Sequence, residues 1–322
     1  MTLLLAAGLL AGCSDTNTPE QRNEIVVQTD VRPMTQRIPA RRAITYGSNA
    51  ELQAEDLRID AYFLNTASKY LDGAKLHYDA SAWKFWTAGE PGEQVHYYWP
   101  VEGSVYDPAS ANITVSSLDF VGYCPFATPA YIEDLTYNTA NHDVSFTCAA
   151  LPMTSAGQAS LKEFMFGMAL DKNKTNAASG VNLSFVHPFA RIKFLLSSAS
   201  VANGVTIDSI AITGIKNNGS FSYTHSTGIS AWTPSGSTTN LIVSASPATG
   251  EDYYLLVPQT FAEPLTVTVR ANWNDWGDTP VAHILSTTIA PDSWQVGYSY
   301  TYTFHVTAED LTVNITNFTE QW

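Results

Sequence analysis

The sequence predicts an all-β protein made of two antiparallel β-sandwich domains in tandem. The plainest signal is YSYTYTFHV at residues 298–306, where aromatic and polar side chains alternate with the two-residue period of a strand. Turn dipeptides such as Asn203-Gly204 separate several apolar runs. No helical pattern is long enough to alternate with these strands, which argues against a parallel α/β sheet.

Composition supports a folded protein outside the cytoplasm. A length of 322 residues suffices for one large or two ordinary domains. Aromatic residues make up 12%, too many for a disordered chain, and charged residues only 14%, as in secreted β proteins. The net charge of -14 argues against nucleic acid as a partner and against simple electrostatic docking on anionic lipid.

Eight segments beyond residue 43 are expected to form strands. In chain order they are 57–63, 95–99, 113–123, 183–196, 207–215, 253–257, 265–273 and 298–306. Pro188 interrupts the fourth and predicts a bulge or bend. Further turns are expected at Asn218-Gly219, Ser235-Gly236 and Thr249-Gly250. The polar stretch 171–180 predicts the division between an N-terminal domain, 43–178, and a C-terminal domain, 179–322.

The start of the chain has the pattern of an export signal. An apolar run, 3–10, is too short to span a bilayer as a helix and leads into Leu10-Ala11-Gly12-Cys13. This pattern resembles a bacterial lipobox, which implies removal of the signal peptide before Cys13 and lipidation of its thiol. The absence of Lys or Arg before the run leaves open a start farther upstream. The alternative is an ordinary apolar start with a chance cysteine.

Residues 14–42 are expected to be a polar tether or a pro-segment. They hold five of the eight arginines of the chain: Arg22, Arg32, Arg37, Arg41 and Arg42. A flexible linker kept solvated by its charges is one interpretation. The other is a segment removed by a protease that cuts at exposed arginine, since proteolysis favours mobile chain.

Several landmarks follow one another in a characteristic order. They are Trp99-Pro100, LDFVGYCP at 118–125, LSFVHPFARIKF at 183–194 and WQVGYSYT at 294–301. With the lipobox and the Arg-rich segment, this ordered set resembles the Bacteroidetes fimbrillins, the subunits of the type V pilus, over essentially the whole chain. Each motif is degenerate when taken alone.

The resemblance implies a fold and an assembly mechanism. It implies two transthyretin-like β-sandwich domains, a lipidated precursor and trimming at an arginine. Removal of the first strand then opens a groove for a donor strand from another subunit, whose main chain and alternating side chains complete the open sheet edge. Arg37, Arg41 and Arg42 are the processing candidates because they lie just before the first predicted strand. Ala43 would then become the new N-terminus.

The C-terminal stretch 311–318 alternates apolar with polar residues. Leu311, Val313, Ile315 and Phe318 carry the apolar side chains. The stretch could be a donor strand or the last strand of its own domain, and the second interpretation is favoured.

No motif for catalysis, a metal or a cofactor is found. The nucleophile elbow, the phosphate loop, the His-Glu-x-x-His motif and the dinucleotide fingerprint are all absent from the sequence. His187, within one of the landmarks, is expected to be structural. Asp275 and Asp278 could offer oxygens to calcium, although a hairpin turn explains them more simply. We therefore expect a protein that is not an enzyme.

Cys124 and Cys148 are the thiols that remain after lipidation of Cys13. A disulfide between them and two separate buried thiols are equally compatible with the sequence. Trp83, Trp86 and the run 97–99 could form an exposed aromatic platform, but a place in the core is favoured.

The sequence thus predicts a fimbrial subunit at the cell surface. It would be exported as an outer-membrane lipoprotein, processed at an arginine and assembled into a pilus by donor-strand exchange, with a role in adhesion. Expected partners are other pilus subunits, the outer membrane through the lipid, and a surface protein or glycan. The alternative is a glycan-binding surface lipoprotein that works alone.

Overall fold

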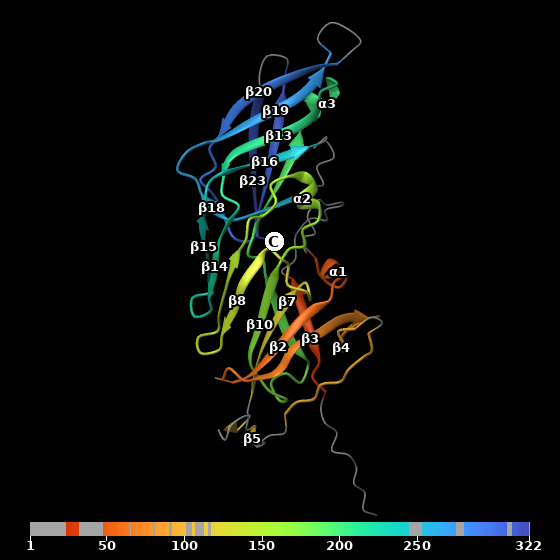
Figure 1. Ribbon diagram of the computed structural model, residues 1–322. Helices are drawn as coiled ribbons and strands as arrows, with labels where there is room; N and C mark the ends of the chain where they lie inside the picture. Colours follow the sequence, from red (N-terminus) through yellow and green to blue (C-terminus); the bar gives the residue numbers. More distant parts are fainter. Residues whose placement is uncertain are drawn as a thin grey trace, which may run out of the picture.

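The computed structural model describes most of the chain as an elongated arrangement of β-sheets stacked end to end (Figure 1). The described residues are 24–31, 48–64, 66–79, 81–89, 92–100, 105–106, 113–114, 117–244, 253–274, 280–307 and 311–321. The predicted all-β class is confirmed. The described helices are single short turns, α1 (Asn49–Leu52), α2 (Ser155–Ala159) and α3 (Ser198–Ala202), and none of them is long enough to cross a membrane.

The first half of the molecule is organised around a seven-stranded sheet. Its order is β1 (Val27–Val31), β11 (Val181–Val186), β10 (Met165–Lys172), β7 (Leu118–Cys124), β2 (Leu57–Phe63), β3 (Lys69–Asp79) and β4 (Ala82–Trp86). A four-stranded sheet accompanies it, in the order β15 (Ile229–Ser235), β14 (Asn218–Thr224), β9 (Asp143–Cys148) and β8 (Ile132–Asn138). A further short pair is β5 (Val105–Tyr106) with β6 (Ile113–Thr114).

The seven-stranded sheet buries side chains on both of its faces. Successive residues of β7 alternate between two apolar clusters, so Phe120 lies in one and Val121 in the other. The first cluster also holds Ile25 and Val27 from the N-terminal segment. The second includes Phe146 and Phe221 from the four-stranded sheet, whose rings stack 4.8 Å apart. Burial on both faces explains why all seven residues of β7 are buried.

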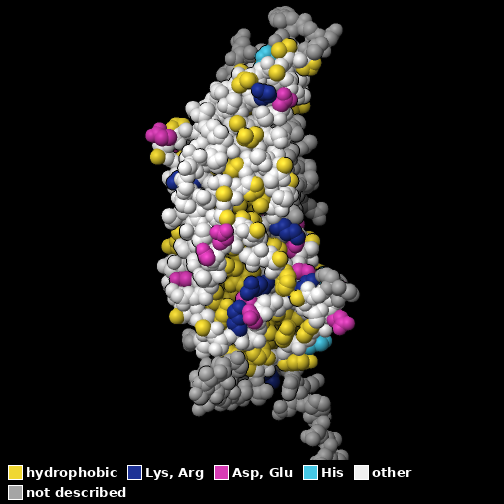
Figure 2. Space-filling view, viewed as in Figure 1, with side chains coloured by type: hydrophobic (Ala, Val, Ile, Leu, Met, Phe, Trp, Pro, Cys, Tyr) yellow, Lys and Arg dark blue, Asp and Glu magenta, His cyan; other side chains and the backbone are white. Residues whose placement is uncertain are grey.

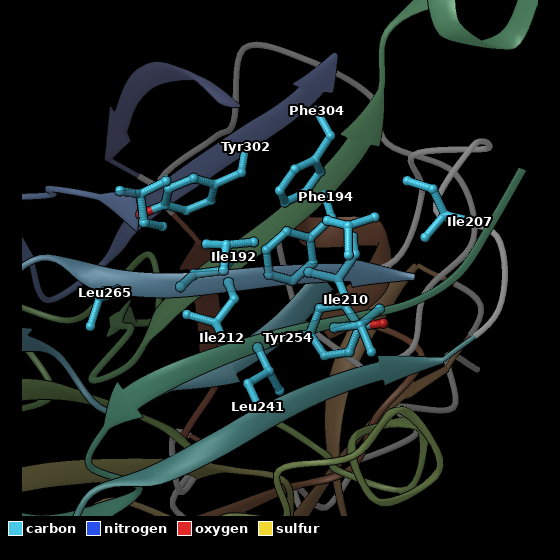
Figure 3. Close-up of a cluster of buried hydrophobic side chains, with 14 of the residues drawn as sticks. Ile192, Phe194, Ile207, Ile210, Ile212, Leu241, Tyr254, Leu265, Tyr302 and Phe304 are labelled. Atoms are coloured by element: carbon cyan, nitrogen blue, oxygen red, sulfur yellow. The ribbon is translucent and has the colours of Figure 1, made fainter. Parts of the chain in front are cut away.

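The C-terminal half is a sandwich of two four-stranded sheets. One has the order β17 (Tyr253–Leu256), β12 (Ala190–Leu196), β22 (Tyr298–Val306) and β23 (Leu311–Gln321). The other has the order β16 (Thr239–Ser244), β13 (Thr206–Ile215), β19 (Leu265–Trp273) and β20 (Val281–Ile289). Between them lies an apolar core in which Phe194, Tyr302 and Phe304 face Ile210 and Ile212 (Figure 3). The short strands β18 (Gln259–Thr260) and β21 (Ser293–Trp294) pair with each other.

Several predicted strands are found with the expected bounds. Strands β2, β19 and β22 coincide with the segments 57–63, 265–273 and 298–306. The break expected at Pro188 is also confirmed, because β11 ends at Val186 and β12 begins at Ala190. Gly236, between β15 and β16, has the positive φ of +73° that favours glycine in a turn.

Other expectations are corrected. Asn218-Gly219 begins β14 instead of forming a turn, and residues 95–99 form one isolated bridge, at Tyr98, instead of a strand. The sheets are not wholly antiparallel, since β1 pairs with β11 and β12 with β22 in parallel. Two segments beyond residue 178 pair with N-terminal strands: β11 with β10, and β14 with β9. These long-range pairings are set by packing between distant segments, which local sequence patterns do not report.

Candidate functional site

The segment 24–31 precedes most of the Arg-rich region and is built into the seven-stranded sheet. Its β-branched residues Ile25, Val26 and Val27 favour an extended backbone. The two-residue period buries Ile25 and Val27, each 2% exposed, while Val26 is 48% exposed. The packed edge strand β1 continues from Val27 to Val31. We call the segment 24–31 the N-terminal strand segment.

On one side this segment pairs with β11. The pairing is parallel and runs from Val27 opposite Val181 to Val31 opposite Phe185. The N–H of Val181 also donates to the carbonyl of Val26 over 2.7 Å, and the Gln28 side-chain amide donates to the carbonyl of Ser179 over 2.9 Å. β11 thus pairs with every residue of β1.

The approach to β11 depends on Gly180. Its φ of +110° lies in the region that L-residues avoid. A Cβ at this position would lie 3.3 Å from the Val26 carbonyl oxygen and 3.3 Å from Cγ of Gln28. Glycine therefore allows the turn before β11 and the close passage of the N-terminal strand segment.

On the other side the segment contacts the far end of the same sheet. The N–H of Ile25 donates to the carbonyl of Tyr97 over 2.8 Å, and Glu24 forms a bridge with Tyr98. Nδ1 of His96 lies 2.7 Å from Oε1 of Glu24. The preceding residues cover β4, because Val95 N–H donates to the Phe85 carbonyl over 2.8 Å. The sheet therefore curls until its two ends meet at the N-terminal strand segment.

The underside of the segment completes an apolar cluster. Ile25 and Val27 pack in the same cluster as Leu52 of α1 and the β11 residues Val181, Leu183 and Phe185, all of which are buried. Burying one Ile or Val side chain stabilises the fold by about 1.5–3 kcal/mol. Removing the segment would expose a two-sided apolar slot with unpaired main-chain groups on β11. Such a slot can accept another extended strand.

Sequence reasoning missed this strand. Ile25, Val26 and Val27 are a short β-branched signal inside a charged stretch, and the partner of β1 is more than 150 residues away in the sequence. The predicted lipidation site Cys13 and the processing candidates Arg37, Arg41 and Arg42 lie outside the described residues. In sequence, however, the segment lies between Cys13 and those arginines, so a cut at any of the three would sever it from the rest of the chain.

The C-terminal stretch is a strand of its own domain. β23 pairs antiparallel with β22, from Val306 opposite Leu311 to Tyr298 opposite Gln321. Leu311, Val313, Ile315 and Phe318 all lie on this strand, at the edge of its sheet. This is the interpretation that the sequence favoured.

The two cysteines that the structure describes, Cys124 and Cys148, are separate buried thiols. Cys124 lies in the apolar cluster that contains Ile25, and Cys148 lies in the cluster on the opposite face of the sheet. The Cys148 thiol donates to the carbonyl of Ala149 over 3.1 Å. Burial is the main cause that raises the pKa of Cys148 to about 12. Of the two alternatives, the disulfide is thus the one that the structure does not form.

The aromatic residues expected in the core are largely there. Trp83 is buried, and Tyr97 and Trp99 pack against the same apolar cluster. Tyr98 is the most exposed of them at 37%, and its carbonyl accepts a hydrogen bond from the Tyr70 hydroxyl. These rings support the curled end of the sheet and do not form an open platform.

The remaining candidates are one histidine and two aspartates. His187 is buried, with Nδ1 2.9 Å from Oε1 of the buried Glu163, as expected for a structural histidine. Asp275 and Asp278 fall outside the described residues. Within the described part of the chain, no group of three or more His, Cys, Asp or Glu side chains is arranged to hold a metal ion.

Known proteins with a similar sequence or fold were found for this chain. A family model described as fimbrillin-like matches residues 48–322. Among solved structures, a fimbrial protein from Bacteroides vulgatus has a TM-score of 0.55 at 10% identity, covering 92% of this chain and 100% of that one. A candidate cell adhesion protein from Bacteroides uniformis has a TM-score of 0.52 at 15% identity, covering 92% and 98%. No curated protein matches the sequence. At these identities the solved structures show a shared fold.

Proposed function

This chain belongs to the fimbrillin-like family, and from that premise we propose that it is a type V pilus subunit assembled by strand exchange at the N-terminal strand segment. The subunit serves in cell adhesion and has a structural role, not a catalytic one. Its partners are other pilus subunits. The observation that carries the proposal is that Ile25 and Val27 are buried in the apolar cluster beneath β1 and lie on the amino-terminal side of the candidate cleavage sites.

The proposed route begins with export. The precursor is exported as a lipoprotein acylated at Cys13. The lipid anchors it in the outer membrane, because each buried methylene contributes roughly 0.8 kcal/mol to membrane binding. A protease then cuts at Arg37, Arg41 or Arg42. From that point the N-terminal strand segment is held only by non-covalent contacts.

Exchange follows from the geometry of the slot. β1 has one regular strand partner, β11, and the pairing is parallel, which is slightly less stable per residue than an antiparallel pairing. An incoming strand that presents apolar side chains at alternate positions refills the sites of Ile25 and Val27 and takes over the main-chain groups of β11. The donor strand that we propose is the C-terminal stretch of another subunit, with Leu311, Val313, Ile315 and Phe318 as its apolar side chains. In that subunit β23 must first leave its partner β22.

The proposal is tested by mass spectrometry of the protein from native cells, with gel analysis of unboiled samples. We expect a mature N-terminus just after Arg37, Arg41 or Arg42 and a ladder of heat-sensitive multimers. A chain in which these three arginines are replaced by alanine should stay acylated at Cys13 and run as a monomer. Arg22→Ala is the matched control, because Arg22 precedes Ile25 and a cut there leaves the segment attached. A native protein that starts at Cys13 and is only monomeric would contradict assembly by strand exchange.

A further inference from the structure

A cleft of about 1130 Å³ lies between the two halves of the molecule. One wall comes from β14 and β15 of the first half. The other comes from the segments 258–265 and 293–298 of the C-terminal half, which contain β18 and β21. Figure 1 shows β15 and β18 as neighbours near the middle of the molecule. A cleft of this size between two structural units is a common place for a ligand site.

The wall from the first half is one face of the β14–β15 pair. Ser230, Trp232 and Pro234 occupy alternate positions of β15, line the cleft and are partly buried. The residues between them are exposed, as expected for the opposite face of a strand. Tyr223 of β14, which is opposite Ser230, adds a second ring to this wall. Both rings pack against the apolar cluster that contains Phe146, yet neither is fully buried.

The wall from the C-terminal half adds further rings and polar groups. Phe261 and Tyr298 line the cleft and pack against the C-terminal core. Phe261 contacts the buried ring of Trp294 edge to face, with ring centroids 4.7 Å apart. Ser293 and Gln295 belong to the same wall. Within the described part of the chain, neither the Tyr298 hydroxyl nor the Gln295 side-chain amide has a hydrogen-bond partner, so both are available to a ligand.

Hydrogen bonds hold both walls in place. Nε1–H of Trp232 donates to the carbonyl of Pro188 over 2.6 Å. On the opposite wall, the buried Gln259 side chain accepts from the Lys216 N–H over 3.0 Å and donates to the Lys216 carbonyl over 2.9 Å. A ligand that binds between walls fixed in this way causes little loss of protein conformational entropy.

The lining carries few charges. Its charged side chains among the described residues are Lys216 and Glu263, together with the buried His187 that faces Glu163. Figure 2 shows a similar scarcity on the visible face, where most of the surface is uncharged. With a net charge of -14 the chain does not attract an anionic ligand. A purely apolar ligand would leave the hydroxyl and amide groups of the cleft without partners.

Proline makes the cleft a poor site for a peptide strand. Pro234, Pro258 and Pro264 all line it, and each lacks the N–H that main-chain pairing with an extended peptide requires. A ligand must therefore be recognised by side chains. Aromatic rings suit the C–H faces of sugar rings, because an aromatic face carries partial negative charge. Hydroxyl and amide side chains suit sugar hydroxyl groups, which both donate and accept hydrogen bonds.

We propose that this cleft binds a short, uncharged oligosaccharide. The C–H faces of its sugar rings pack on Trp232 and Tyr223, and its hydroxyl groups form hydrogen bonds with the Tyr298 hydroxyl and the Gln295 amide. The inference names a ligand class for the adhesive role proposed above and rests on that role. It does not depend on strand exchange, because the cleft contains no residue of the N-terminal strand segment.

An array of neutral, sialylated and sulfated oligosaccharides tests this proposal. The untrimmed Cys13→Ser chain is displayed as tetramers, which strengthens weak monovalent binding, and we expect it to bind neutral oligosaccharides. Ser230→Trp fills the cleft and should raise the Kd for the best neutral ligand at least about tenfold, measured by calorimetry. Ala231→Trp is the matched control, because the next residue lies on the exposed face of the same strand, and it should leave the Kd unchanged.

Three results would overturn the proposal: no binding to any neutral oligosaccharide, binding that requires sialic acid or sulfate, or an unchanged Kd for Ser230→Trp. A peptide selected from a display library that binds the wild-type chain but not Ser230→Trp, without any oligosaccharide binding, would assign the cleft to a peptide instead. The thermal unfolding midpoint of each variant checks that the fold is retained.

A second pair of variants tests the polar contact. Tyr298→Phe removes only a hydroxyl, and we expect the Kd to rise about two- to tenfold through the loss of one hydrogen bond. Tyr98→Phe removes a hydroxyl from a tyrosine that is 37% exposed outside the cleft, and it should leave the Kd unchanged. Equal Kd values for these two variants would contradict a ligand bound at Tyr298. These assays use the unassembled chain, so the ladder of multimers remains a separate test of pilus assembly.

Discussion

The backbone N–H of Ile25 donates to the carbonyl of Tyr97 over 2.8 Å and joins the N-terminal strand segment to the opposite end of its own sheet. The following residues of the segment pair with β11. A segment of eight described residues therefore closes a curled seven-stranded sheet. Because its covalent link to the rest of the sheet passes through the Arg-rich stretch, a single cut can convert this closing strand into a removable one.

The buried side chains of the segment should contribute strongly to stability, and the exposed one should not. Ile25→Ala removes most of a side chain that is 2% exposed, and we expect it to lower the free energy of unfolding by about 2–5 kcal/mol. Val26→Ala, at a position 48% exposed, should change it by less than about 0.5 kcal/mol. Urea unfolding of the untrimmed chain measures both, and equal effects would show that the segment is not packed as described.

Gly180 should be intolerant of a side chain. Gly180→Ala places a Cβ in a left-handed backbone conformation and against the Val26 carbonyl, at a cost of about 1–3 kcal/mol. Gly89→Ala is the control, because a Cβ at Gly89 meets no atom within 4 Å. We also expect faster amide hydrogen exchange in residues 25–31 of Gly180→Ala. Unchanged amide hydrogen exchange in these residues would show that Gly180 does not help to hold the N-terminal strand segment in place.

The Cys148 thiol should be unreactive in the folded protein. Its pKa is raised to about 12, chiefly by burial, so almost none is thiolate at pH 8. Iodoacetamide at pH 8 should therefore modify Cys148 only after unfolding in urea, as read by peptide mass spectrometry. Rapid labelling of the native chain would mean that the cluster containing Phe146 opens readily.

Asp56 should make stability decline in acid. Partial burial is the largest single influence and raises its pKa, but hydrogen bonds and charges from Lys75 and His77 outweigh it and leave the pKa below its usual value. A lowered carboxyl pKa stabilises the fold above the unfolded-state pKa of about 3.9 and loses that effect as pH falls through the folded-state pKa.

Asp56→Asn should therefore lose about 0.5–1 kcal/mol at pH 7, a modest value because the pair is partly exposed, and less at pH 3. Urea midpoints at the two pH values measure the difference. An equal loss at both would assign the effect of the substitution to packing instead of charge.

The sequence predicted those elements whose signal is local. Tyr298 to Val306 alternates so regularly that β22 was predicted with its observed bounds, and Pro188 marked the break between β11 and β12. The fimbrillin-like family was also recognisable from the ordered landmarks, and the family match confirms it.

What the sequence did not reveal depends on partners far away in the chain. The charged surroundings of Ile25 and Val27 hide a strand that is fixed by Val181 and Tyr97. Asn218-Gly219 has turn chemistry, yet it begins β14 because Gly219 lies opposite Cys148 of β9.

The central claim is that the N-terminal strand segment must leave its slot before subunits can join. Gln28 and Asn182 are paired in register between β1 and β11, and both side chains are exposed. A disulfide between Gln28→Cys and Asn182→Cys would lock the segment in place without altering its buried face.

The decisive measurement is assembly of this double variant after cleavage by an arginine-specific protease, with and without reductant. The account predicts no multimers while the disulfide is intact, a heat-sensitive ladder once dithiothreitol is added, and a ladder under both conditions for the Gln28→Cys single variant. Multimers of the oxidised double variant equal to those of the reduced one would contradict exchange at this strand.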